Sequence, residues 1–147
     1  MGEAKGVSTS GEEEKNWEVE ENAQELKEKD VKKFRGLAAR LNYLAADRRD
    51  IAYAVKEVYR GMARPRRGDW KRLMRIARYL ITTKRTMTGY PWQDEESTVD
   101  TYTHSDWAGC RVTGKSTSGG LTMIGGHLIT SWATTQASIA LSSAEAE

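Results

Sequence analysis

The spacing of apolar residues changes once along this chain of 147 residues, near residue 82, and this change limits the fold more than any other feature. Before that point apolar residues recur every three or four positions, which is the period of an α-helix. After it, Thr-rich stretches alternate with Gly-rich turns, a pattern typical of β-strands. The sequence therefore predicts an α+β protein in which a helical part precedes a sheet.

Three helices are expected in the first part, over about residues 33–84. The first carries its apolar residues on one helical face, at Leu37, Leu41 and Leu44. Asp47 is a candidate N-cap for the second, whose apolar stripe consists of Ile51, Val55, Val58 and Met62. Pro65 and Gly68 break the pattern before the third helix. Asp69 is its candidate cap, and its stripe consists of Trp70, Leu73, Ala77 and Leu80.

The second part predicts a three-stranded antiparallel meander. Its strands are expected at residues 99–107, 119–124 and 127–134. Gly125 and Gly126 suit a two-residue hairpin turn, and residues 82–92 are expected as a further strand or hairpin edge. Residues 142–145 match a capping box, so a helix should begin there, with the chain ending about one turn into it. One face of such a sheet would be left bare.

Charge and composition divide the chain into three segments. Residues 1–32 are acidic and are expected to be disordered or a frayed helix, residues 33–86 form the helical segment, and residues 87–147 form the sheet domain. Residues 1–30 carry ten acids and four bases, a net charge of −6, and residues 56–86 carry eleven bases and two acids, a net charge of +9. This asymmetry indicates that the segments differ in function.

Several classes of protein are excluded. The single Cys110 cannot form an internal disulfide and gives no zinc-ligand spacing. No apolar run approaches the roughly 20 residues that span a membrane, and residues 1–11 do not resemble a secretory signal. We therefore expect an intracellular protein, in the cytoplasm or the nucleus, with no membrane partner.

Short motifs occur in a fixed order over about residues 33–147. They are Phe34-Arg35, Leu41-Asn42-Tyr43-Leu44-Ala45, Arg48-Arg49-Asp50-Ile51, Ser105-Asp106-Trp107-Ala108-Gly109, Lys115-Ser116-Thr117-Ser118-Gly119, Ser131-Trp132 and Ala140-Leu141-Ser142-Ser143-Ala144-Glu145-Ala146-Glu147. The ordered set resembles the Pol polyprotein of copia-type LTR retrotransposons, which reads S-D-x-D-W-A-G, R-K-S-T-S-G, I-S-W and A-L-S-S-T-E-A-E-Y in the second part. Arg49 and Gly114 depart from the family, which has Pro and Arg at these positions.

The resemblance implies that the chain joins the C-terminal region of a reverse transcriptase to the start of a ribonuclease H domain. The paired aspartates of the polymerase would lie upstream, and no Tyr-x-Asp-Asp sequence occurs in this chain. The fold implied is α+β: a helical connection segment followed by a truncated ribonuclease H-like antiparallel sheet of three strands and the first turn of a helix. The partners implied are an RNA–DNA hybrid, or other nucleic acid, and the rest of the polyprotein.

Ribonuclease H chemistry uses carboxylates that hold two Mg²⁺ ions about 4 Å apart. By resemblance, the first carboxylate position is His104 here, the second is Glu147, and the later acids lie beyond residue 147. A neutral imidazole is a poor ligand for Mg²⁺, so His104 is expected to disable the site. Asp106 lies two residues on and hence on the same strand face; it is either a substitute metal carboxylate or a strand-end acid. The family thus implies Mg²⁺, and productive binding is not expected.

Nucleic-acid contacts are expected from a basic cluster and from a Ser/Thr-rich motif. The cluster consists of Arg64, Arg66, Arg67, Lys71, Arg72, Arg75 and Arg78. A template–primer duplex passes this region in a reverse transcriptase, and the alternative is a solvated helix face balanced, or shielded in cis, by the acidic N-terminal residues. Lys115, Ser116 and Thr117 suit phosphate oxygens or an ordinary turn. Trp107 and Trp132 suit base stacking or half-buried strand positions.

Three hypotheses of function follow. The chain is a polyprotein fragment whose ancestral ribonuclease H is inactive, a nucleic-acid-binding fragment acting through residues 56–86, or a translated remnant with no activity. Steep salt dependence of duplex binding favours the second hypothesis. Failure to fold alone favours the third.

Overall fold

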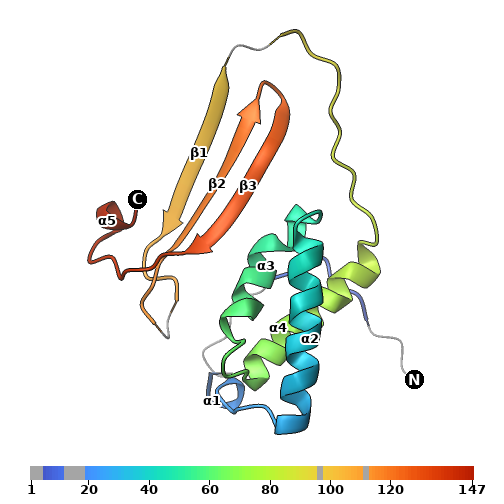
Figure 1. Cartoon of the computed structure of the whole chain (residues 1–147), viewed down its shortest axis with the longest axis vertical. Coiled ribbons are helices and arrows are strands. Elements are labelled where there is room, and N and C mark those ends of the chain that lie inside the picture. Colours follow the sequence, from blue (N-terminus) through green and yellow to red (C-terminus); the bar gives the residue numbers. More distant parts are fainter. Residues whose placement is uncertain (1–4, 12–18, 96–97, 111–112) are drawn as a thin grey trace. The chain divides into compact units, whose positions relative to one another are not determined.

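The computed structural model describes residues 5–11, 19–95, 98–110 and 113–147. Four helices are followed by three strands and a short final helix (Figure 1), so the predicted α+β fold is confirmed. The chain divides into two compact units, Met1–Thr86 and Met87–Glu147. None of the described helices is long and apolar enough to cross a membrane.

The helical unit contains α1 (Val19–Asn22), α2 (Glu28–Ala45), α3 (Arg49–Arg60) and α4 (Arg67–Thr82). The helices α2, α3 and α4 pack around one core (Figure 1). Its buried members are Phe34, Ala38, Ile51, Ala54, Val55, Val58, Leu73 and Ile76. Burial of these side chains, at roughly 1.5–3 kcal/mol for each large one, is the main stabilising contribution in this unit.

The buried faces agree with the predicted ones for α3 and in part for α2. In α3 the predicted Ile51, Val55 and Val58 are buried. In α2 the predicted Leu37 and Leu41 are partly buried against the core, whereas Leu44 is exposed and the fully buried residues are Phe34 and Ala38. The helix also begins at Glu28, five residues before the expected start.

The predicted helix caps are also corrected. The residue before α3 is Arg48, not Asp47, and the residue before α4 is Arg66, not Asp69. Asp69 lies in the first turn of α4, where its carboxylate accepts a hydrogen bond from the Arg66 backbone N–H at 2.9 Å. A carboxylate there satisfies a free amide and interacts favourably with the helix dipole, so Asp69 caps α4 from within.

The described N-terminal residues lie along the helical unit and form no long helix. Residues 5–11 contain no helix or strand, and hydrogen bonds join them to α4. Glu25 forms an isolated antiparallel bridge with Arg66. The expectation of disorder over residues 1–32 falls partly on residues 1–4 and 12–18, which lie outside the described residues.

The sheet unit is the predicted three-stranded meander. Strands β1 (Val99–Asp106), β2 (Thr117–Ile124) and β3 (His127–Thr135) are antiparallel in the order β1-β2-β3, and α5 (Ser143–Ala146) follows. Gly125, in the turn between β2 and β3, has φ +55°. This left-handed conformation suits Gly in a two-residue hairpin turn, as the sequence predicted.

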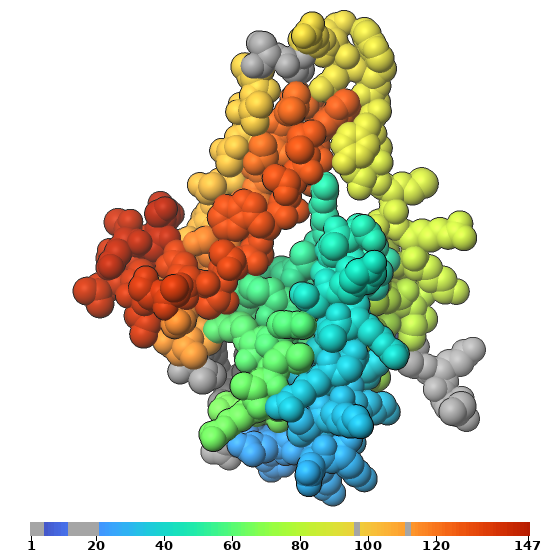
Figure 2. Space-filling view, in the orientation of Figure 1, coloured from blue at the N-terminus to red at the C-terminus, as the bar shows by residue number. Residues whose placement is uncertain are grey.

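The expected strand over residues 82–92 is absent. Residues 83–95 contain no strand, and side chains hold their later part to the β2–β3 hairpin instead. The Tyr90 hydroxyl donates to the Leu128 carbonyl at 3.2 Å, and the Gln93 amide bridges the Ile124 carbonyl and the Gly126 N–H at 3.0 and 2.9 Å. Figure 2 shows this segment in yellow against the orange strands. Pro91 has no N–H for a strand ladder.

Strand β1 is exposed on both faces. Val99 and Tyr102, which alternate across the strand, are 63% and 60% exposed. The sequence predicted one bare face, whereas side chains on both faces of β1 are exposed over its first six residues. Of its eight residues, only Ser105 and Asp106 are shielded.

A charged network joins the start of α3 to α4. The Arg48 guanidinium is buried and donates from Nε and Nη2 to the Asp50 carboxylate at 2.9 and 2.7 Å. The Tyr79 hydroxyl of α4 donates to the same carboxylate at 2.9 Å. The hydrogen bond from Arg48, aided by Tyr79, lowers the pKa of Asp50 below its ordinary value of 3.8, although partial burial opposes this.

This network makes the free energy of unfolding of the helical unit depend on pH in the acidic range. Because the folded pKa of Asp50 is lowered, the stabilisation is complete above roughly pH 5, where the unfolded carboxyl is also ionised, and it is lost as pH falls through the folded pKa. We expect Asp50→Asn to lower the free energy of unfolding at pH 7 by about 1–2 kcal/mol, and to flatten its decrease between pH 5 and pH 2. Urea unfolding followed by circular dichroism measures both. The nearby exposed Asp47→Asn is the control, and an equal effect of the two variants would contradict the assignment.

Candidate functional site

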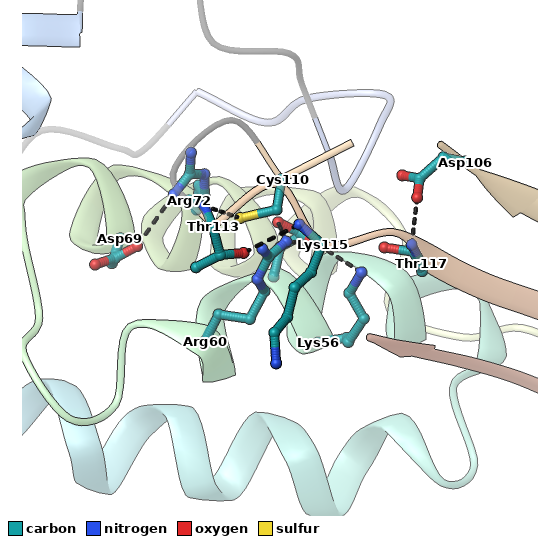
Figure 3. A network of polar contacts seen from close by, with 10 residues as sticks. Lys56, Arg60, Asp69, Arg72, Asp106, Cys110, Thr113, Lys115 and Thr117 are labelled. Atoms are coloured by element: carbon teal, nitrogen blue, oxygen red, sulfur yellow. Dashed lines mark hydrogen bonds and ion pairs between the residues drawn. The ribbon is translucent and has the colours of Figure 1, made fainter. Parts of the chain in front are cut away.

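Two of the sequence motifs meet at one end of the sheet. Asp106 and Thr117 are register partners on β1 and β2, and the Asp106 carboxylate accepts a hydrogen bond from the Thr117 backbone N–H (Figure 3). Next to them, the Ser116 hydroxyl accepts a hydrogen bond from the Ala108 backbone N–H at 3.0 Å. We call Asp106, Ala108, Ser116 and Thr117 the motif cluster.

The chain turns directly after β1, at Trp107 and Ala108. Ala108 has φ +52°, a conformation that residues other than Gly rarely adopt. A Cβ at Gly109 would meet the Asp106 carboxylate, which would then have to shift from its present position. Ser116 is fully buried. The two motifs therefore hold together the end of β1 and the start of β2.

The three residues proposed to contact phosphate have partners within this unit. The Ser116 hydroxyl accepts from the Ala108 N–H, and the Thr117 N–H donates to the Asp106 carboxylate. The Lys115 ammonium donates to the Ala137 carbonyl at 2.6 Å. Nucleic-acid binding by these residues stays a prediction. The observed contacts correspond to the alternative of an ordinary turn.

The proposed catalytic positions lie near this end of the sheet. His104 is exposed on β1 opposite Gly119, and alternation places it on the same face as Asp106. Glu147 is exposed directly after α5, which packs against β1. The Gln136 amide holds α5 by donating to the Ser118 hydroxyl and to the Ala146 carbonyl at 2.8 and 2.6 Å.

This set of donors does not fit a Mg²⁺ site. Mg²⁺ requires anionic or neutral oxygen ligands in octahedral geometry, and the first position offers the imidazole of His104. The carboxylate of Asp106 is engaged with the Thr117 amide. Within the described residues, no group of three or more His, Cys, Asp or Glu side chains is placed to hold a metal ion.

The start of α5 forms half of the predicted capping box. The Ser142 hydroxyl accepts from the Glu145 N–H at 3.2 Å, as a capping box requires. The Glu145 carboxylate accepts from the Leu141 N–H at 2.8 Å, one residue before the N-cap, instead of from Ser142. Glu145 of this motif is therefore occupied in capping.

The two tryptophans considered for base stacking are partly exposed. Trp107 donates from its indole N–H to the Ala140 carbonyl at 3.1 Å and is 54% exposed. Trp132 is opposite Gly120 in the sheet and is 43% exposed. A Cβ at Gly120 would lie 2.8 Å from the Trp132 ring, so the indole covers this glycine. Each ring thus has a structural contact together with an open surface.

The predicted basic cluster lies along α4 and the turn before it. Arg64 and Arg66 are exposed in the turn, and Arg67, Lys71, Arg75 and Arg78 recur at helical spacing along α4. Arg72 instead pairs with the Asp69 carboxylate at 3.0 Å (Figure 3). The helix therefore presents a row of cations on one side, which we call the basic row: Arg67, Lys71, Arg75 and Arg78.

The N-terminal residues supply partners along the whole basic row. Glu21 contacts Arg67 and Lys71, each at 3.4 Å, and Arg67 also donates to the Gln24 side chain at 3.2 Å. Farther along α4, Arg75 donates to the Thr9 hydroxyl at 2.9 Å and Arg78 donates to the Lys5 carbonyl at 2.6 Å. The sequence predicted only the opposite net charges of the two segments. It gave no signal that selects Glu21 among the many nearby acids.

Comparison with known proteins finds relatives in Arabidopsis thaliana, two of them polyproteins of transposons. It is 36% identical over 119 residues to the "Uncharacterized mitochondrial protein AtMg00810" of Arabidopsis thaliana. It is 32% and 33% identical over 118 residues to the retrovirus-related Pol polyproteins from transposons RE2 and RE1 of the same plant. The chain is homologous to retrotransposon Pol polyproteins. The resemblance that the motifs indicated is thus confirmed.

These alignments cover 80% of the chain but only part of each relative. The chain spans about half (49%) of the length of the mitochondrial protein and 8% of each Pol polyprotein. It therefore corresponds to one segment of Pol. No family model matches the sequence, and no solved structure matches it.

The motif cluster predicts a structural role for the carboxylate of Asp106. Asp106→Ala should speed hydrogen exchange of the Thr117 amide about tenfold, because this amide loses a charged hydrogen-bond acceptor. Asp106→Asn keeps an acceptor oxygen and should preserve most of the protection. His104→Ala, on the same face of β1, is the control. Unchanged exchange in Asp106→Ala, measured by NMR, would show that the bond does not stabilise the turn.

Proposed function

We propose that the chain is the segment of a Pol polyprotein in which the C-terminal region of the reverse transcriptase passes into a ribonuclease H-like domain, and that this domain does not cleave RNA. The observation that carries the second part is His104 on β1, at the position where the S-D-x-D-W-A-G motif has its first Asp. Homology to Pol polyproteins supports the assignment to a polyprotein segment.

The absence of cleavage follows from charge and geometry. Two Mg²⁺ ions bring four positive charges together, and carboxylates must compensate them. His104 supplies no negative charge when neutral. Asp106 lies two residues along β1, roughly 6–7 Å away, and already accepts the Thr117 amide. Moving this carboxylate to a metal would release the turn that links β1 to β2.

Restoring the carboxylate should restore the chemistry only when the rest of the site is present. We expect no Mg²⁺-dependent cleavage of a labelled RNA–DNA hybrid by the natural chain. Cleavage should appear in a chimera that carries His104→Asp and continues, after Glu147, with the corresponding downstream part of the RE1 Pol polyprotein. Gel analysis of the labelled RNA measures the product.

The matched control is the same chimera with His104 retained, which should not cut. Cleavage by the natural chain would contradict the inactive assignment and make Asp106 the first residue to replace. A restored chimera that also fails to cut would contradict the ribonuclease H part of the proposal. It would leave the homology to Pol polyproteins untouched.

A second candidate function, binding of nucleic acid through the helical unit, is favoured by the basic row and its neighbours. Arg64 and Arg66 are exposed directly before α4, next to the cations of the row. Closely spaced Lys and Arg side chains neutralise successive phosphates and release counterions. Such contacts read no base, so the ligand is expected to be an RNA–DNA hybrid or another duplex without sequence preference. A remnant with no activity remains the third alternative.

Removal of two exposed cations tests this second function. Arg64→Gln with Arg66→Gln should weaken hybrid binding and lower the steepness of its salt dependence by about two, since each phosphate contact contributes roughly 0.9. Fluorescence anisotropy over a series of salt concentrations measures both quantities. Lys29→Gln with Lys32→Gln removes the same charge from exposed positions of α2. Equal losses in the two variants would indicate a net-charge effect and contradict a defined interface.

A further inference from the structure

A single carboxylate bridges two cations of the basic row. Glu21 lies 3.4 Å from both Arg67 Nη2 and Lys71 Nζ, and these cations are one helical turn apart on α4. The three side chains are 47%, 49% and 45% exposed, respectively. An anionic oxygen held by an Arg and a Lys is also the arrangement that a backbone phosphate adopts on a basic helix.

The same two cations border a small pocket. Its volume is about 280 Å³, and it is lined by Leu26, Asp30, Arg67, Trp70 and Lys71. Leu26 and Trp70 provide an apolar surface beside the cations, while Asp30 opposes a second anion. This combination suits one phosphate at the cations with its sugar against the apolar side chains. It does not suit a ligand with several adjacent charges inside the pocket.

We propose that Arg67 and Lys71 form a phosphate-binding site for a nucleic-acid backbone, and that Glu21 occupies this site in the absence of nucleic acid. The inference rests on the proposed nucleic-acid binding by the helical unit. Binding at this site requires Glu21 to leave the two cations. The N-terminal residues therefore act as a competitor that belongs to the same chain.

Nucleic acid can replace Glu21 because the contact between Glu21 and the two cations is weak. Ion pairs between half-exposed side chains contribute little and are screened by salt. A backbone presents a phosphate at every nucleotide, and its gain comes partly from released counterions. A single surface carboxylate contributes less free energy than this, so nucleic acid can displace it. Its presence nevertheless raises the concentration of nucleic acid that is needed for binding.

Neighbouring contacts keep Glu21 near its position. Arg67 donates to the Gln24 side chain, and its backbone N–H donates to the Gln24 carbonyl at 2.8 Å. The Leu26 N–H donates to the Pro65 carbonyl at 2.9 Å. These backbone bonds do not involve the Glu21 carboxylate, so they hold the segment in place when the side chain rotates away.

The test compares two single-charge variants of the full chain. Glu21→Gln removes the carboxylate that touches the cations, and Glu25→Gln removes an exposed carboxylate from the same segment. We expect Glu21→Gln to bind a fluorescent RNA–DNA hybrid roughly threefold to tenfold more tightly, with a salt dependence steeper by about one to two. Glu25→Gln should change the affinity by less than about twofold, because the Glu25 side chain is exposed to solvent and the residue pairs with Arg66 through the backbone. Circular dichroism verifies that both variants fold like the natural chain.

A third variant assigns the gain to the site. Adding Arg67→Gln and Lys71→Gln to Glu21→Gln should remove the increase in affinity. Equal tightening by Glu21→Gln and Glu25→Gln, or a gain that persists without the two cations, overturns the inference. If Glu21→Gln has no effect while Arg64→Gln with Arg66→Gln weakens binding, the inference fails and the nucleic-acid function stands. If no variant binds the hybrid at low salt, both fail.

Discussion

The bond between the Asp106 carboxylate and the Thr117 amide sets the geometry of the sheet unit. It joins the last residue of β1 to the first residue of β2, which are also partners in the strand register. Beside it, the Ser116 hydroxyl accepts a hydrogen bond from the Ala108 N–H, and the carboxylate occupies the space that a Cβ on Gly109 would need. Residues of two motifs that are shared with Pol polyproteins thus have structural contacts that do not depend on catalysis.

Much of the fold was predictable from the sequence, because helical and strand periods are local properties. Ile51, Val55 and Val58 identified the buried face of α3, and the Gly125-Gly126 pair identified the hairpin. The face of α2 was predictable in part, since Leu37 and Leu41 pack against the core while Phe34 and Ala38 are its buried centre. Residues 82–92 had the composition of a strand, but Tyr90 and Gln93 bind the hairpin through side chains rather than through a ladder.

In the candidate site, the sequence likewise predicted some features and not others. Strand alternation was enough to place His104 and Asp106 on one face, and helical spacing was enough to align Arg67 with Lys71. The partners of these residues depend on contacts between distant parts of the sequence. Neither the Thr117 amide as the partner of Asp106 nor Glu21 as the partner of the two cations follows from spacing. Arg48 and Asp50 also belong to a sequence motif, and spacing did not predict their partner. The Asp50 carboxylate accepts hydrogen bonds from Arg48 and from Tyr79 of α4, which joins α3 to α4.

The attachment of Glu21 to the same chain as its cations has a consequence for ligand length. A tethered group competes at an effective concentration, in the millimolar range for a short linker, that dilution of the protein does not change. A free dinucleotide whose intrinsic affinity for the two cations equals that of Glu21 must exceed that concentration to displace it. A long strand meets several cations of α4 at once, so each phosphate after the first is also tethered. The helical unit would therefore distinguish long nucleic acids from short ones without reading any base.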